Sequence, residues 1–170
     1  YYAISPQIHR DAQFTSGGIP IGLKSEIDYF SPLARLALGQ LAIRPNLSTH
    51  RAVEVEDSEK LEAVLEEWRI STAAALLSAD DLGLISVWSA TFLFPVFDVI
   101  KSNWTEVAGR VKNRARRTAL QRLFENFRPD RQVQGMQAFL AEAWPSLKVV
   151  SCWADGASAD AAVRLGDEIP

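Results

Sequence analysis

The segment from Trp144 to Ala157 constrains the fold of this chain more than any other stretch. It reads WPSLKVVSCWADGA: a Trp-Pro pair, a short apolar run over 147–153, and an Asp-Gly turn that opens a helical run to Leu165. A short apolar run bounded by turn residues predicts a buried strand. A strand that ends in a glycine turn and leads into a helix is where α/β enzymes usually hold ligands.

The rest of the chain alternates between the same two kinds of pattern. Strands are expected at 1–5, 84–88 and 147–153, and residues 7–18 read as a loop. Helices are expected at 26–41, from a cap at Asp57 or Ser58 through about 76, at 91–103, at 104–127, at 132–143 and at 157–165. This alternation predicts a helix-rich α/β fold with a partly parallel sheet.

Composition sets the broad class of the protein. The chain has 170 residues, of which 48% are hydrophobic and 23% charged, so it suits a single globular domain. The net charge of −3 argues against nucleic acid as a main partner. Cys152 is the single cysteine, which excludes a disulfide framework, and two histidines disfavour a His-rich metal site.

The sequence also bears on location. The longest apolar run, Trp88 to Phe97, is too short for a membrane helix and is interrupted by Pro95. No segment has the plan of a secretory signal, so we expect a cytoplasmic protein without a membrane partner. The chain opens on Tyr1 rather than Met and stops abruptly at Pro170, which suggests a piece of a longer polypeptide.

Three motifs allow a functional and a structural interpretation. The Thr-Ser-Gly-Gly at 15–18 and Lys24 approach a phosphate loop, but Pro20 lacks the N–H such a loop needs, so a turn or an organic-ligand wall is favoured. The arginine-rich helix at 110–122 suits phosphate or nucleic acid, yet a solvated face is favoured because the chain is acidic and no aromatic side chains alternate with the arginines. Asp155 either caps the next helix or faces a ligand.

Aromatic and hydroxyl side chains gather where the strand at 84–88 gives way to a helix. Trp88, Ser89, Thr91, Phe92 and Phe94 suit an apolar ligand with a polar group, and ordinary core packing explains each of them equally well. Cys152 reads as a buried, inert thiol because no histidine is close in sequence. No Gly-x-Ser-x-Gly, His-Glu-x-x-His or Cys-x-x-Cys motif is present.

Three blocks together resemble the auxin-responsive promoter protein family, the acyl-acid amido synthetases, in its bacterial branch. They are YYAISP at 1–6 with TSGGIPIG at 15–22, LISVWSATFL at 84–93, and WPSLKVVSCWADG at 144–156. The blocks follow the family's order and span nearly the whole chain. The resemblance implies an internal piece of the large N-terminal domain of an adenylate-forming enzyme.

The resemblance also implies an activity. The parent enzyme would use ATP and Mg²⁺ to adenylate a small carboxylic acid, release pyrophosphate, and transfer the acyl group to an amino acid. The acid-binding residues it nominates are Ile19, Lys24, Ser25, Tyr29, Trp88, Ser89, Thr91 and Phe92. The nucleotide-binding residues it nominates are Ala154, Asp155, Gly156 and Ala157.

The resemblance assigns no catalytic or metal-binding residue to this chain. It puts the family's phosphate loop before Tyr1, and the acidic magnesium motif and the mobile C-terminal domain after Pro170. We therefore expect the chain alone to be inactive, with sheet edges that favour self-association. The alternative is a stand-alone, non-catalytic module that binds a small ligand or another protein.

Overall fold

The computed structural model describes residues 2–4, 13–14, 16, 20–21, 31–33, 58–132 and 134–169. The strands are β1 (Tyr2–Ile4), β2 (Gln13–Phe14), β3 (Pro20–Ile21), β4 (Leu84–Ser89) and β5 (Val149–Trp153). The helices are α2 (Ser58–Ser78), α3 (Leu93–Ser102), α4 (Trp104–Arg110), α5 (Arg114–Phe127), α6 (Gly135–Ala143) and α7 (Ala159–Glu168). Two short 3₁₀ helices, η3 (Ala90–Phe92) and η4 (Gly156–Ser158), follow β4 and β5.

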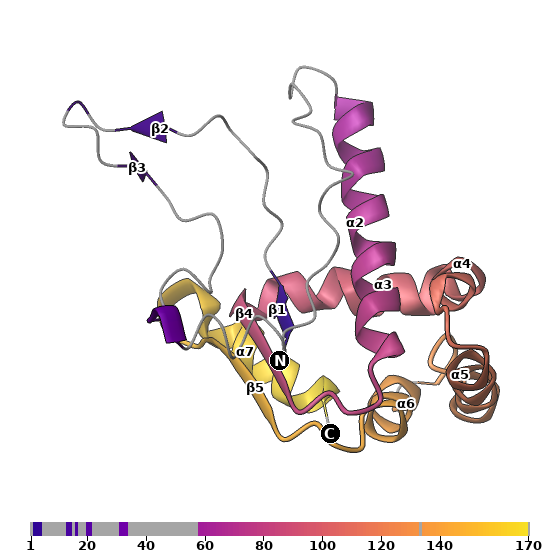
Figure 1. Ribbon diagram of the computed structural model, residues 1–170. Coiled ribbons are helices and arrows are strands. Elements are labelled where there is room, and N and C mark those ends of the chain that lie inside the picture. The colour runs from indigo at the N-terminus through magenta and orange to yellow at the C-terminus, as the bar shows by residue number, and fades with distance from the viewer. Residues whose placement is uncertain are drawn as a thin grey trace.

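A three-stranded parallel sheet joins the beginning, middle and end of the chain. Its strand order is β1-β4-β5, and Figure 1 shows the three strands side by side. Ile4 lies opposite Val87, and Ile85 lies opposite Val150. β2 and β3 form a separate antiparallel pair. The prediction of a helix-rich α/β fold with a partly parallel sheet is confirmed, as are strands near 1–5, 84–88 and 147–153.

Helix packing supplies most of the hydrophobic core. Trp104 of α4 stacks on Phe124 of α5 with ring centroids 4.3 Å apart, and Phe139 of α6 meets both rings edge-on. Trp144, which follows α6, is fully buried and donates its indole N–H to the Leu76 carbonyl at 3.0 Å. This hydrogen bond ties the end of α6 to the last turn of α2, so the helices form one packed body with the sheet.

The prediction of one helix over 104–127 is wrong. The chain leaves the helix at Val111, whose backbone is extended and whose side chain is fully buried. Asn113 then caps a new helix, α5, by accepting a hydrogen bond from the Arg116 N–H at 3.1 Å. An asparagine side chain that satisfies a free N–H stabilises a helix start, and burial of Val111 fixes the bend. The helix expected at 26–41 lies outside the described residues except for 31–33.

The prediction that the strands are buried holds for one face of the sheet only. Ile85 and Val87 of β4 are buried, and Val150 of β5 packs against the same core. On the opposite face Trp88 is 48% exposed, Val149 48% and Trp153 67%. Alternation along a strand sends neighbouring side chains to opposite faces of the sheet. The described helices that contribute to the core pack against the face that carries Ile85, Val87 and Val150. In the described ranges, no helix is long and apolar enough to cross a membrane.

Candidate functional site

The carboxyl end of β4 carries a pair of hydroxyl groups. Ser89 has extended backbone angles and caps η3, its Oγ accepting a hydrogen bond from the Thr91 N–H at 3.3 Å. The Thr91 hydroxyl also donates to Ser89 Oγ at 2.9 Å. Serine is a favoured cap because its short side chain reaches a free N–H of the first turn. The two hydroxyls therefore sit together, at a partly exposed end of the strand.

The carboxyl end of β5 is an open turn. Asp155 accepts a hydrogen bond from the Gly156 N–H at 2.7 Å, so it does cap the following helical segment. Gly156 has a φ of +55°, a left-handed conformation that favours glycine. A Cβ placed on Gly156 would meet no atom within 4 Å. The turn from Ala154 to Ala157 is exposed throughout, so a ligand can reach its backbone.

Two tryptophans join these strand ends on the exposed face of the sheet. Ser86 lies opposite Ser151, and a register shift then brings Ser89 opposite Trp153. Trp88 and Trp153 lie two residues beyond the paired serines, so both point to the same face. Their indole rings are parallel within 7°, with centroids 5.9 Å apart. The pair forms a flat apolar surface at the carboxyl end of β4, the strand end that Ser89 and Thr91 follow in sequence.

A contact between α3 and α7 fixes the helices that follow the two strands. The Arg164 guanidinium lies over the Phe94 ring, 4.2 Å from its centroid. A cation over an aromatic face is an attractive contact. Arg164 also pairs with Glu168, one turn further along α7. This contact holds the segment after β4 against the segment after β5, so the two turns lie together at the carboxyl end of the sheet. We call this end the β4–β5 edge.

The structure brings together part of the predicted site. Trp88, Ser89 and Thr91 lie at the same sheet edge as the turn at 154–157. Phe92 instead packs against the hydrophobic core, which leaves it little surface for a ligand. The remaining predicted residues lie outside the described ranges: Ile19, Lys24, Ser25 and Tyr29.

Trp153 belongs to this edge and was not among the residues expected at the site. Its signal was its position, two residues after Ser151 and directly before the glycine turn, which puts it at the end of a strand. The apolar run that forms β5 does not alternate with polar residues, so its sequence does not show which side chains are buried and which are exposed. Pairing with β4 decides that Trp153 faces solvent.

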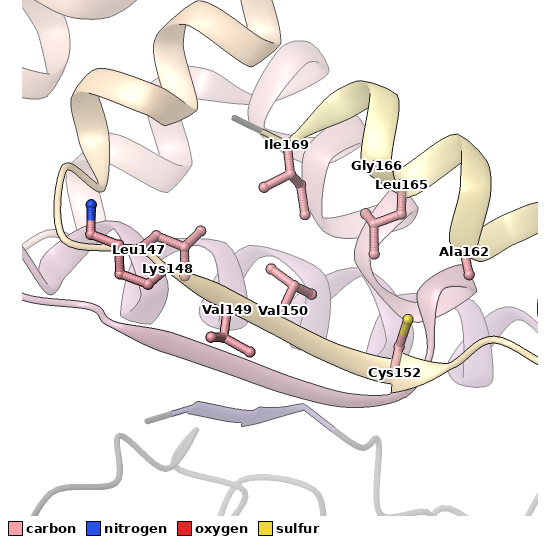
Figure 2. A pocket seen from close by; sticks show the side chains of 9 residues that line it. All are labelled: Leu147, Lys148, Val149, Val150, Cys152, Ala162, Leu165, Gly166 and Ile169. Carbon is pink, nitrogen blue, oxygen red and sulfur yellow. The ribbon is translucent and has the colours of Figure 1, made fainter.

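A hollow lies between β5 and α7. It has a volume of about 250 Å³, and Figure 2 shows Val150, Cys152, Leu165 and Ile169 around it. The half-buried Cys152 thiol contributes to the wall, so this cysteine is less buried than expected. No residue predicted for acid or nucleotide binding lines this hollow. It is therefore separate from the sheet edge that carries Trp88 and Trp153.

The nucleotide and Mg²⁺ that the resemblance implies fit this edge only in part. The open backbone at Gly156 can accept a flat ring. Exposed Asp155 and Asp160 put negative charge at the start of α7, which opposes a phosphate there. Within the described part of the chain, no group of three or more His, Cys, Asp and Glu side chains could hold a metal ion. The turn at 154–157 therefore fits the ring of a nucleotide better than its phosphates.

Comparison of the chain with protein-family models, curated proteins and solved structures found no match. What bears on the function of this protein is therefore the geometry of the β4–β5 edge and the three sequence blocks.

Proposed function

We propose that the β4–β5 edge binds a small carboxylic acid within an ATP-dependent acyl-acid amido synthetase. The observation that carries the proposal is the stacking of Trp88 on Trp153, with ring centroids 5.9 Å apart, at the carboxyl end of β4 where Ser89 and Thr91 follow. The sequence blocks that resemble the acid-binding and nucleotide-binding segments of that family contain these strand ends. In this structure the ends of β4 and β5 are neighbours.

Each described residue has a defined part in this proposal. The tryptophan pair gives the apolar body of the acid a flat surface. Each hydroxyl has one proton to donate, and that of Thr91 goes to Ser89 Oγ. Ser89 therefore donates to the carboxylate, since a charged acceptor makes a stronger hydrogen bond than a neutral one. The open turn at Gly156 admits the ring of the nucleotide. ATP would supply the leaving pyrophosphate, and the acyl group would then pass to an amino acid amine.

Binding of acids by the 170-residue chain tests the proposal. A calorimetric titration against aryl and alkyl carboxylic acids, with and without ATP, is expected to find acids that bind. The Thr91→Val variant removes one donor and should weaken that binding by about tenfold. Ser146→Ala, which removes a hydroxyl before the opposite end of β5, is the matched control and should bind as the native chain does.

The same titration separates the proposed function from its alternative. Binding of acids that is equally strong in the native and Thr91→Val chains would contradict a carboxylate at the hydroxyl pair. Binding that ATP leaves unchanged would favour a non-catalytic ligand-binding module. The resemblance assigns no catalytic or metal-binding residue to this chain, so we expect the chain alone to release no pyrophosphate from ATP when acid is added. We expect the complete, ATP-consuming enzyme in the cytoplasm.

A further inference from the structure

We propose that the outer side of α5 docks an acidic segment of a partner protein. Arg114, Arg117 and Arg122 of α5, with Lys112 just before the helix, are the cations of this side, which we call the α5 cationic strip. Lys112, Arg114 and Arg122 are exposed, and Arg117 is half-buried. Figure 1 shows α5 at the periphery of the helical part, on the far side of α2 from β5. A partner there would leave the β4–β5 edge accessible, so this inference is independent of the proposed function.

The arginines of the strip differ from all other arginines in the described ranges. Arg114, Arg117 and Arg122 make no side-chain hydrogen bond or ion pair there, and neither does Lys112. The remaining described arginines bind carboxylates or, for Arg116, backbone carbonyls: Arg69, Arg110, Arg116, Arg128, Arg131 and Arg164. Within the described ranges, the arginines that lack a hydrogen-bonded or ionic partner are therefore those of the strip.

The position of these arginines at the start of α5 is also electrostatically unfavourable. Arg114 and Arg117 lie in the first turn of α5, and that turn holds no acidic residue. The N-terminus of a helix carries partial positive charge, so cations there destabilise the helix and anions stabilise it. Arginines that oppose the helix dipole and lack partners weaken the isolated chain. An anionic partner would remove both effects.

The chemistry of the strip favours a carboxylate-rich protein segment. Arginine binds planar carboxylates through two parallel hydrogen bonds. From Arg114 to Arg122 the helix rises by roughly 12 Å, at about 1.5 Å per residue. An extended acidic segment of about four residues covers that length, at roughly 3.3 Å per residue. Such a segment therefore matches the length of the strip.

Nucleic acid and membrane fit the strip less well. The large hydrophobic side chains that the described ranges expose are Leu33, Trp88, Val149, Trp153 and Val163, and none belongs to α5. The strip thus offers no aromatic platform for bases and no apolar side chain for insertion into lipid. At physiological salt a charge acts over roughly 8 Å, and a DNA duplex is longer than that. A duplex bound at the strip would therefore also lie near other parts of this protein, whose net charge of −3 repels it.

A peptide-binding measurement tests the inference. A dye-labelled peptide of alternating Glu and Ser is titrated with the 170-residue chain, and fluorescence anisotropy reports binding. We expect saturable binding that weakens as salt rises. Replacement of Arg114, Arg117 and Arg122 by Gln should weaken binding by about tenfold, since three charged contacts are lost. The substituted side chains make no hydrogen bond or ion pair within the described ranges, so the variant should keep its fold, as circular dichroism will check.

A matched variant separates docking from net charge. Replacement of Arg69, Arg128 and Arg131 by Gln removes the same charge away from α5 and should leave peptide affinity within about twofold. Equal weakening by both variants, or no binding by the native chain, would show a merely solvated strip and overturn the inference. Tighter binding of duplex DNA or of phosphatidylserine vesicles than of the peptide would overturn it as well.

Discussion

The indole rings of Trp88 and Trp153 lie parallel across the ends of β4 and β5, with centroids 5.9 Å apart. The residues come from sequence blocks separated by four helices, and both are largely exposed. Aromatic pairs of this geometry contribute about 0.5–1.5 kcal/mol beyond buried area. Two exposed tryptophans at a strand edge are better explained by a ligand than by the stability of the fold.

Loss of Trp153 should affect ligand binding more than stability. Trp153→Ala is expected to weaken acid binding by about tenfold or more, because half of the stacking surface is removed. Its free energy of unfolding should fall by only about 1 kcal/mol, since the side chain is 67% exposed. Isothermal titration and urea denaturation measure the two effects. Val163→Ala, another exposed apolar residue, is the control; equal acid affinity in both variants would remove Trp153 from the site.

Arg116 should be the most important arginine for stability among those described. Its guanidinium donates to the carbonyls of Leu77 at 2.9 Å, Ala79 at 3.1 Å and Ala143, and so satisfies the ends of two helices. Burial lowers the pKa of Arg116, yet the group stays protonated at neutral pH. Arg116→Ala should cost about 3 kcal/mol, because partly buried carbonyls lose their donor.

Two further variants test this assignment by urea denaturation. Arg116→Lys should recover less than half of the loss, because one ammonium cannot reach carbonyls in three directions. Arg117 is next in sequence and makes no side-chain hydrogen bond or ion pair within the described ranges, so Arg117→Ala should change the free energy of unfolding by less than about 0.5 kcal/mol. Similar losses in Arg116→Ala and Arg117→Ala would contradict a special role for the Arg116 hydrogen bonds.

Removal of the Thr72 hydroxyl should stabilise the protein. Thr72 is fully buried in α2, and within the described structure its Oγ1 has no hydrogen-bond partner. Thr72→Val keeps the branched shape and removes the unpaired polar atom, so we expect a gain of about 1 kcal/mol. Thr72→Ser keeps the hydroxyl and loses a methyl group, so it should destabilise. A thermal unfolding series measures both, and a loss in Thr72→Val would reveal a partner for the hydroxyl.

Asp130 should titrate below the usual range for aspartate. Arg128 donates to its carboxylate at 3.2 and 3.1 Å, which lowers the pKa of Asp130. Because the folded pKa is depressed, the stabilising contribution is present above the unfolded value of about 3.9 and is lost as pH falls through the folded pKa. Carboxyl-carbon NMR measures this titration. Arg128→Gln should raise the pKa of Asp130, whereas Arg122→Gln should leave it unchanged.

Local sequence signals predicted several elements of the fold correctly. The short apolar run at 84–88 became β4, and Ser89 caps the next segment as its side-chain chemistry favours. The run before Asp155 became β5, and Asp155 caps the turn that follows. Each of these depends on a few adjacent residues. The bend at Val111 escaped prediction because a buried valine and an asparagine cap, within an otherwise helical pattern, need a folded core to outweigh helix propensity.

The candidate site was only partly accessible to the same reasoning. Ser89 and Thr91 were nominated, and their hydroxyls do meet, because both lie within one turn of sequence. Phe92 was nominated with them but packs into the core. Trp153 was not nominated, because an apolar run does not reveal which of its faces neighbouring elements will cover.

The sequence by itself determined where most of the described strands and helices lie, since capping side chains, glycine turns and apolar runs act over a few residues. Tertiary structure alone decided that β5 lies beside β4, that Trp88 meets Trp153, and that Arg116 closes two helix ends. These relationships join residues tens of positions apart. They depend on which faces the core buries, and that choice is made only when all the helices pack together.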